Sequence, residues 1–197
     1  IRALMGTHMQ CQAVPLLKPS SPVVGTGMEA SVSASMHRSI HARHGGKVEY
    51  VDANKVVITV DEKELAKAKE DALTDEFEYV HLEGKKEIYS LTKFYRTAQS
   101  TCFTQKPVVK MGQVIKAGEL IINGPSSEDG ELALGQNLLI AYTSYEGLGY
   151  EDAIIISDRL VKQDLLTSIH INEYECQVMD TKLGPEELTG DIPNVSD

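Results

Sequence analysis

One stretch decides the fold class of this chain: residues 45–60 read GGKVEYVDANKVVITV. Its two halves, 47–51 and 55–60, are rich in β-branched residues, which favour extended strands. Two glycines precede the first half, and Asp52-Ala53-Asn54 separates the halves in the manner of a tight turn. The sequence therefore predicts a β-hairpin over residues 47–60.

Other segments outside the hairpin also read as strands or short helices. A second strand pair is predicted at 106–109 and 118–122, connected through 111–117. Three further apolar runs predict strands at 137–142, 153–157 and 167–171. The charge-dense run 62–70 favours a short solvated helix inside a surface excursion spanning 61–87, and a second helix is expected at 158–164, capped by Ser157 or Asp158. The expected fold class is mainly β, with short helices.

Charge is distributed unevenly along the chain. The 197 residues carry a net charge of −10, which argues against a simple nucleic-acid-coating protein. Residues 1–48 nevertheless carry +4, and residues 49–197 carry −14. A polyanionic partner is therefore plausible for the first quarter of the chain alone.

The sequence lacks the motifs that identify several other classes of protein. No apolar run is long enough to span a bilayer, and no signal segment opens the chain. Cys11, Cys102 and Cys176 form no C-x-x-C pair, so reduced thiols in a cytoplasmic protein are expected rather than a zinc site or a disulfide framework. Phosphate-cradling loops, a nucleophile elbow and an H-E-x-x-H helix are also missing. The chain starts at Ile1 and stops at Asp197, so we expect both ends to be cuts in a longer polypeptide.

The first candidate for chemistry is the pair Glu151-Asp152, which follows a glycine-rich turn. Two neighbouring carboxylates can hold a hydrated Mg²⁺, a hard cation that prefers oxygen ligands and keeps several waters. In a strand, adjacent side chains point to opposite faces, so only one of the two would reach a given ion directly. The alternative is an acidic pair that is merely solvated.

The second candidate is the opening segment of the chain. Arg2 is suited to binding a phosphate through two hydrogen bonds, and Gln10 and Gln12 are neutral groups suited to sugar or phosphate contacts. The alternative is an ordinary helix end or loop that runs into Pro15.

A third motif, residues 110–120, resembles the strand-turn-strand of biotinyl and lipoyl carrier domains. Those domains place an acceptor lysine on the next hairpin, but residues 123–130 contain no lysine. A related fold is expected there, without the swinging arm of a carrier.

In chain order, these pieces resemble the β subunit of bacterial RNA polymerase. The resemblance covers nearly the whole chain, with a gap at about 61–87. Its motifs are RALMG from Arg2, Q-A-V-P from Gln12, VGTGME from Val24, YSLTKFYR from Tyr89, QSTC from Gln99, GPSS from Gly124, GELALGQN from Gly130, EDA from Glu151, TSIHI from Thr167, DTKLGPEEL from Asp180 and DIPNV from Asp191. Their number and order make the resemblance far more specific than any single motif.

The resemblance implies a partial double-psi β-barrel with a barrel-sandwich-hybrid insertion. Residues 1–44 would form the first part of the barrel and hybrid-binding region, and 45–122 the insertion. Further barrel strands would lie in 123–171, and 172–197 would begin the flap region. The remaining barrel strands would come from much later in the subunit.

It also implies an activity, that of DNA-directed RNA polymerase, a nucleotidyltransferase. Two Mg²⁺ ions would stabilise the attacking and leaving oxygens, with the principal ligands on the β′ subunit. Glu151 and Asp152 would face the incoming triphosphate and the second Mg²⁺, Asp152 through water. Arg2 would contact the nucleotide phosphates, and Gln10 and Gln12 the RNA. The fragment alone would be inactive.

The implied partners are the remaining polymerase components, in the bacterial cytoplasm at the nucleoid. They are the β′ subunit, the α dimer, ω, a sigma factor, template DNA, the RNA–DNA hybrid and nucleoside triphosphates. No membrane is involved. The alternative function is a non-catalytic module that docks to β′ or to regulators.

Two positions depart from the family pattern close to its rifamycin pocket. Cys11 stands where Arg is usual and His8 where Asn is usual. Because a forked cation is lost at Cys11, we expect abnormal rifamycin binding by the whole enzyme.

Overall fold

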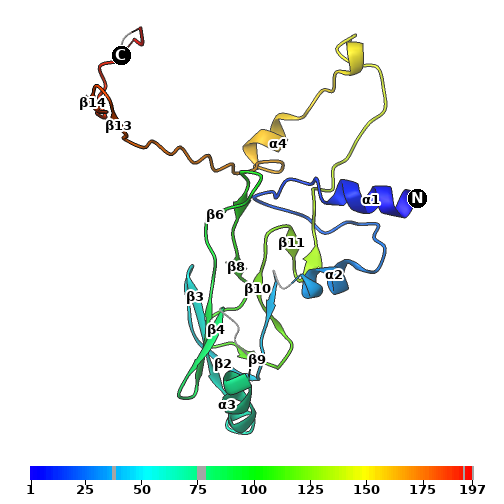
Figure 1. The fold of residues 1–197 in the computed structure, drawn as a ribbon. Coiled ribbons are helices and arrows are strands. Elements are labelled where there is room, and N and C mark those ends of the chain that lie inside the picture. Colours follow the sequence, from blue (N-terminus) through cyan, green and yellow to red (C-terminus); the bar gives the residue numbers. More distant parts are fainter. Residues whose placement is uncertain (37–38, 75–78, 193, 197) are drawn as a thin grey trace.

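The computed structural model of the chain describes residues 1–36, 39–74, 79–192 and 194–196. Figure 1 shows an elongated molecule, with most strands at one end and α1, a long arm and the C-terminal segment at the other. His37 and Arg38 of the basic first quarter, and residues 75–78 of the charged excursion, lie outside the described residues.

The largest sheet is antiparallel and five-stranded, in the order β4-β5-β3-β2-β9. The hairpin predicted from residues 45–60 supplies β2 and β3, and β3 is the central strand. These strands are β2 (Gly46–Val51), β3 (Lys55–Val60), β4 (Val80–Glu83), β5 (Lys86–Ser90) and β9 (Val114–Ile115).

The hairpin turn is held by one carboxylate. Asp52 Oδ1 accepts hydrogen bonds from the backbone N–H groups of Asn54 and Lys55, both at 2.7 Å. This local hydrogen bonding is why aspartate favours such turns. These backbone hydrogen bonds, first that from Asn54 and then that from Lys55, hold the pKa of Asp52 below its ordinary value. The turn predicted at 52–54 is confirmed.

A smaller sheet packs beside the large one and completes the core. Its order is β1-β10-β8, with strands β1 (Ile40–His41), β8 (Lys106–Pro107) and β10 (Leu120–Asn123). The predicted pairing of 106–109 with 118–122 is confirmed in shorter form, as Pro107 opposes Ile122. Apolar residues of both sheets form the main buried cluster, which includes Val56, Ile58, Tyr89, Ile115, Ile121 and Ile122.

Three strand pairs and two helices complete the strand-rich part and the C-terminal segment. The pairs are β6 (Tyr95–Arg96) with β7 (Cys102–Phe103), β11 (Ser127–Glu128) with β12 (Glu131–Leu132), and β13 (Asp180–Thr181) with β14 (Gly184–Pro185). Helix α2 (Glu29–Ser35) packs against β12, and α3 (Leu65–Thr74) against β4. The structure is thus strand-rich with short helices, and within the described residues none of the sheets closes into a barrel.

The charged excursion is a largely exposed segment that a few contacts tie to the sheet. The predicted helix is present as α3, but Ala68 is buried and the Glu64 carboxylate accepts the backbone N–H of Gly45 at 2.6 Å. The excursion also contains β4 and the start of β5. Polar contacts such as that of Glu64 therefore hold it against the sheet, while most of its described residues are exposed. The predicted solvated helix in a surface excursion is confirmed.

Three predicted strands are absent from the described residues. Segments 137–142 and 153–157 have no strand, and 167–171 makes only the isolated pairs Leu16–Ser168 and Thr101–His170. A strand needs a hydrogen-bonding neighbour on at least one edge. In the part of the chain that the structure describes, no neighbouring strand lies beside 137–142 or 153–157, and both segments lie in a long exposed arm (Figure 1).

The remaining helices are short and lie away from the sheets. They are α1 (Arg2–Gln10), the single turn η1 (Tyr150–Asp152) and α4 (Asp158–Lys162). The helix predicted at 158–164 is confirmed, and Ser157 caps it by accepting the backbone N–H of Arg159. Among the described residues, no helix has the length and apolar character that crossing a membrane requires.

Candidate functional site

The acidic pair Glu151-Asp152 lies in η1, at the far end of the arm (Figure 1). Both residues have left-handed backbone angles, with φ of 51° and 64°. The pair is therefore in a tight turn rather than at the start of a strand, so the rule of alternating strand faces does not apply to it. Neither carboxylate has a hydrogen bond or an ion pair within the described part of the chain.

The arm, residues 138–166, is exposed along almost its whole length. Every residue from 139 to 159 is exposed, including many large apolar side chains. These are Leu139, Ile140, Tyr142, Tyr145, Leu148, Tyr150, Ile154, Ile155 and Ile156. Clustered exposed apolar side chains are typical of surfaces that bind a protein, a membrane or a ligand.

The opening segment forms α1, and all of its candidate residues are exposed. Arg2 begins the helix, Gln10 ends it, and Cys11 is its C-terminal cap. One turn apart, the Gln12 amide lies 3.5 Å from the His8 ring. The helix keeps these side chains on a short, exposed element that ends before Pro15.

The structure does not bring the two candidate groups into contact. No hydrogen bond or ion pair within residues 1–36, 39–74, 79–192 and 194–196 joins Arg2, Gln10 or Gln12 to Glu151 or Asp152. The two candidate groups are connected through the chain between α1 and α2, because the base of the arm is hydrogen-bonded to this segment. We call residues 16–23 the junction segment.

Beyond the junction segment, a short loop before α2 is organised by one carboxylate. Glu29 accepts the backbone N–H of Thr26 at 2.7 Å and that of Gly27 at 2.9 Å. These hydrogen bonds, the one from Thr26 above all, hold the pKa of Glu29 below its ordinary value. A hollow of about 290 Å³ lies beside this loop, and its lining includes Gln10, Glu29 and Asn137.

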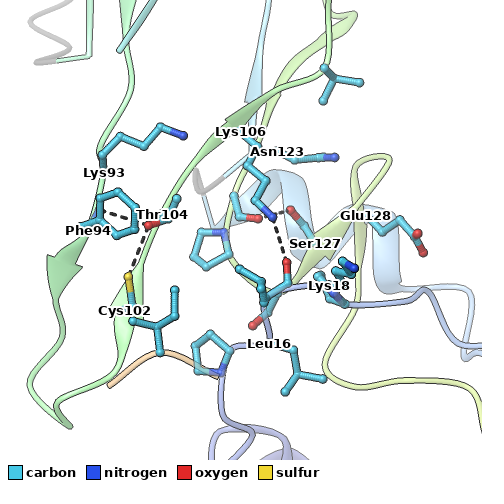
Figure 2. A pocket seen from close by; sticks show the side chains of 18 of the residues that line it. Leu16, Lys18, Lys93, Phe94, Cys102, Thr104, Lys106, Asn123, Ser127 and Glu128 are labelled. Carbon is cyan, nitrogen blue, oxygen red and sulfur yellow. Dashed lines mark hydrogen bonds between the residues drawn. The ribbon is translucent and has the colours of Figure 1, made fainter. Parts of the chain in front are cut away.

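A cavity of about 580 Å³ lies where the junction segment meets β8 and β10. Figure 2 shows Lys18, Lys93 and Lys106 around it, together with Phe94 and Cys102. Burial, and then the nearby charge of Lys106, lower the pKa of Lys93.

Each of the three ammonium groups donates to a backbone carbonyl. Lys18 Nζ lies 2.9 Å from Gln163 O, Lys93 Nζ 2.6 Å from Gln105 O, and Lys106 Nζ 2.8 Å from Leu17 O. These contacts join segments that are far apart in the sequence. The cavity is therefore framed by lysines that hold the fold together.

Metal-binding capacity within this chain is limited. Among the described residues, no group of three or more His, Cys, Asp or Glu side chains is placed to hold a metal ion. Glu151 and Asp152 supply at most one side of a hydrated Mg²⁺, so the other ligands of any such ion would come from outside these residues.

Sequence reasoning missed the residues at the base of the arm. Asn137 and Lys18 make hydrogen bonds between the arm and the junction segment. Asn137 closes the GELALGQN motif, whose residues alone do not indicate that they hold another segment of the chain. The signal available was a polar pair, Gln136-Asn137, directly before an apolar run.

Comparison with known proteins gives consistent matches. The family described as "RNA polymerase Rpb2, domain 6" matches residues 41–197. The DNA-directed RNA polymerase subunit beta of Caldicellulosiruptor bescii is 50% identical over 196 residues, covering 100% of this chain and 14% of that protein. The same subunit of Geotalea daltonii is 50% identical over 196 residues, covering 100% of this chain and 13% of that protein. The chain thus spans about 14% of the length of the curated relatives it matches.

Proposed function

Because the chain belongs to the β-subunit family of bacterial DNA-directed RNA polymerases, we propose that it forms part of the active centre for template-directed RNA synthesis. In this role it positions the nucleoside triphosphate, the second Mg²⁺ and the RNA 3′ end. It acts in the cytoplasm, in complex with β′, the α dimer, ω and a sigma factor. The template DNA and the RNA–DNA hybrid complete the assembly.

The observation that carries the proposal is the state of the acidic pair. Glu151 and Asp152 stand at the end of an exposed arm, and neither carboxylate has a partner among the described residues. Two successive non-glycine residues with positive φ are uncommon, and such backbone is found most often at functional sites. The pair is therefore available to a group that arrives from outside the chain.

The chemistry assigned to the pair is electrostatic. When bound, Mg²⁺ neutralises the charge that develops on the phosphoryl group during in-line displacement. Asp152 would hold the second ion through a water molecule, and Glu151 would add a second negative charge on the same turn. This chain contributes one side of the site, in keeping with its lack of a full ligand set in the described part.

The opening helix supplies the contacts to substrate and product. Arg2 binds the phosphates of the nucleotide, since its guanidinium forms paired hydrogen bonds to phosphate oxygens. Gln10 and Gln12 contact the RNA near its end. The exposure of all three side chains, two on α1 and Gln12 just after it, supports these roles.

We also propose the finer fold that goes with this function. Residues 1–44 and 123–171 contribute to a double-psi β-barrel, 45–122 form a barrel-sandwich-hybrid insertion, and 172–197 begin the flap region. Strands from the rest of the subunit pair with 137–142 and 153–157 and close the barrel. The unpaired, apolar character of both segments supports this completion.

The test is nucleotide addition by the assembled polymerase carrying Asp152→Ala. We expect a higher requirement for Mg²⁺ or nucleotide and an addition rate lower by about tenfold, the effect of one lost electrostatic contact. Asp61→Ala, at an exposed aspartate in the excursion, is the matched control. Wild-type kinetics for Asp152→Ala across Mg²⁺ and nucleotide titrations would refute the role of this residue.

A second function, docking to the β′ subunit or to regulators without chemistry, is favoured by the apolar side chains of the arm. In that case the 197-residue chain captures purified β′ and shows no nucleotidyl transfer. Ile154→Asp, at a highly exposed position, should reduce the capture. The two functions are compatible if the active centre is assembled between subunits.

A further inference from the structure

The arm that carries Glu151 and Asp152 begins and ends on the same short piece of chain. At its first end, the backbone N–H of Ser20 donates to Gly135 O at 2.8 Å. At its second end, the backbone N–H of Leu17 donates to Thr167 O, also at 2.8 Å. The junction segment 16–23 is therefore a common base for both ends of the arm.

Side chains reinforce the backbone contacts at both ends. The carboxamide of Asn137 donates to Ser20 Oγ at 2.8 Å and to Ser21 O at 2.6 Å, and it accepts the backbone N–H of Val23 at 3.4 Å. At the other end, Lys18 Nζ donates to Gln163 O at 2.9 Å. Both anchors thus join the arm to the junction segment.

Just beyond the second end, Ile171 is also held by the β6–β7 hairpin, since its N–H donates to Ser100 O at 2.9 Å and its carbonyl accepts Arg96 Nε at 3.1 Å. The outer part of the arm has no comparable contact among the described residues. No side chain from 139 to 159 is buried, and η1 has no hydrogen bond to the strand-rich part of the molecule. A segment with few buried contacts moves easily unless its ends are held. The position of the acidic pair therefore depends on how firmly its base is held.

The junction segment is also the direct continuation of the other candidate group. Only Ala13, Val14 and Pro15 separate Gln12 from Leu16. Gln10 and Asn137 line the same hollow of about 290 Å³. A change at Asn137 consequently alters the relation between the acidic pair and the proposed RNA-contacting residues.

We propose that Asn137 is a positioning residue, whose carboxamide fixes the base of the arm and thereby aligns Glu151-Asp152 with the proposed nucleotide site. The inference rests on the proposed function. Asparagine suits the task because its side chain offers two N–H donors and a carbonyl acceptor in a fixed plane. Aspartate has the same shape but lacks both donors, and its charge would face the carbonyl oxygen of Ser21.

The test is a double-mutant cycle in polymerase assembled with the full-length β subunit, measured as single-nucleotide addition on preformed elongation complexes. Asn137→Asp alone should lower the addition rate about tenfold and raise the Mg²⁺ requirement, because small misplacements of a catalytic group are costly. In the Asp152→Ala background, the same change should alter the rate by less than about twofold, since residues that act through one another are not additive. Asn54→Asp, in the exposed β2–β3 turn, is the control for the change of charge.

The outcomes separate this inference from the proposed function. If Asp152→Ala has no effect, the proposed function fails. If Asp152→Ala slows addition but Asn137→Asp has no effect, or has its full effect in both backgrounds, the positioning role fails alone. Loss of assembly for Asn137→Asp also contradicts it, because the residue would then be needed for folding. The same cycle with Lys18→Met, at the second anchor, should also show a lower addition rate, with a smaller effect in the Asp152→Ala background.

Discussion

His44 and Glu87 form a buried hydrogen-bonded pair, with His44 Nδ1 2.6 Å from Glu87 Oε1. The other ring nitrogen of His44 lies 3.1 Å from Asp71 Oδ2 on α3. The second oxygen of Glu87 accepts the hydroxyl of Tyr89 at 2.7 Å. This network links the loop before β2 to β5 and to the helix of the excursion, so it holds three separate parts of the sequence together.

Removing the acid from this network should be strongly destabilising. Glu87→Ala leaves His44 and Tyr89 without their shared partner in a buried site, and we expect a loss of about 3 kcal/mol in the free energy of unfolding. Glu83→Ala, on exposed β4, is the control and should cost less than about 1 kcal/mol. Chemical denaturation of the 197-residue chain measures both, and equal losses would contradict the proposed importance of the pair.

The tyrosine of the network should make stability sensitive to alkaline pH. Burial, and then the Glu87 carboxylate, raise the pKa of Tyr89 above its ordinary value of 10.0. Above pH 10 an unfolded tyrosine loses its proton while the folded state keeps Tyr89 protonated. The folded state then binds more protons, so stability falls as pH rises, by up to about 1.4 kcal/mol per pH unit.

Tyr89→Phe tests this relation. The variant should be less stable than wild type at neutral pH by about 1 kcal/mol, since the hydrogen bond to Glu87 is lost. Its stability should then fall less steeply above pH 10 than that of wild type. Tyr142→Phe, at an exposed tyrosine of the arm, should keep the wild-type slope. A parallel pH dependence for Tyr89→Phe and wild type would rule the explanation out.

Close contact between β2 and β3 makes Gly46 sensitive to any side chain. A Cβ atom at Gly46 would lie 2.2 Å from the backbone oxygen of Thr59, and nothing lies within 4 Å of a Cβ at Gly190. Gly46→Ala should therefore push the central strands apart and cost more than about 2 kcal/mol, a value typical of overpacking. Gly190→Ala should leave the denaturation midpoint unchanged. A stable Gly46→Ala variant would show that the hairpin can shift to make room.

The sequence predicted those parts of the fold whose signals are local. The β2–β3 hairpin was found because alternating β-branched residues and the Asp52 turn lie within sixteen residues of one another. Helix α4 was found because Ser157 is a local cap. The strands predicted at 137–142 and 153–157 are absent from the described structure, because an apolar run does not reveal whether a neighbouring strand is present. In the described residues these segments have none.

The sequence predicted which residue types form the candidate site, but it did not reveal the residues that hold them in place. Glu151-Asp152 and Arg2 stand out in the sequence as charged groups suited to metal and phosphate, and their roles remain proposals. Asn137 could not be recognised, because its partner Ser20 is 117 positions away. Glu87 likewise read as part of a solvated run, although folding buries it against His44. Burial and long-range pairing depend on the whole fold and leave little trace in local composition.

The departures at His8 and Cys11 give a prediction for inhibitor binding, based on the family resemblance. Cys11 caps α1 with an exposed thiol, and an arginine there would offer five N–H donors. In the assembled polymerase, Cys11→Arg should strengthen rifamycin inhibition by about tenfold, the equivalent of one charge-assisted hydrogen bond. Cys176→Arg, at another exposed cysteine, controls for the added charge and should leave inhibition unchanged. The wild-type enzyme could instead be inhibited as strongly as enzymes that have arginine at this position, with no change in Cys11→Arg. That result would show that the cysteine has no part in the pocket.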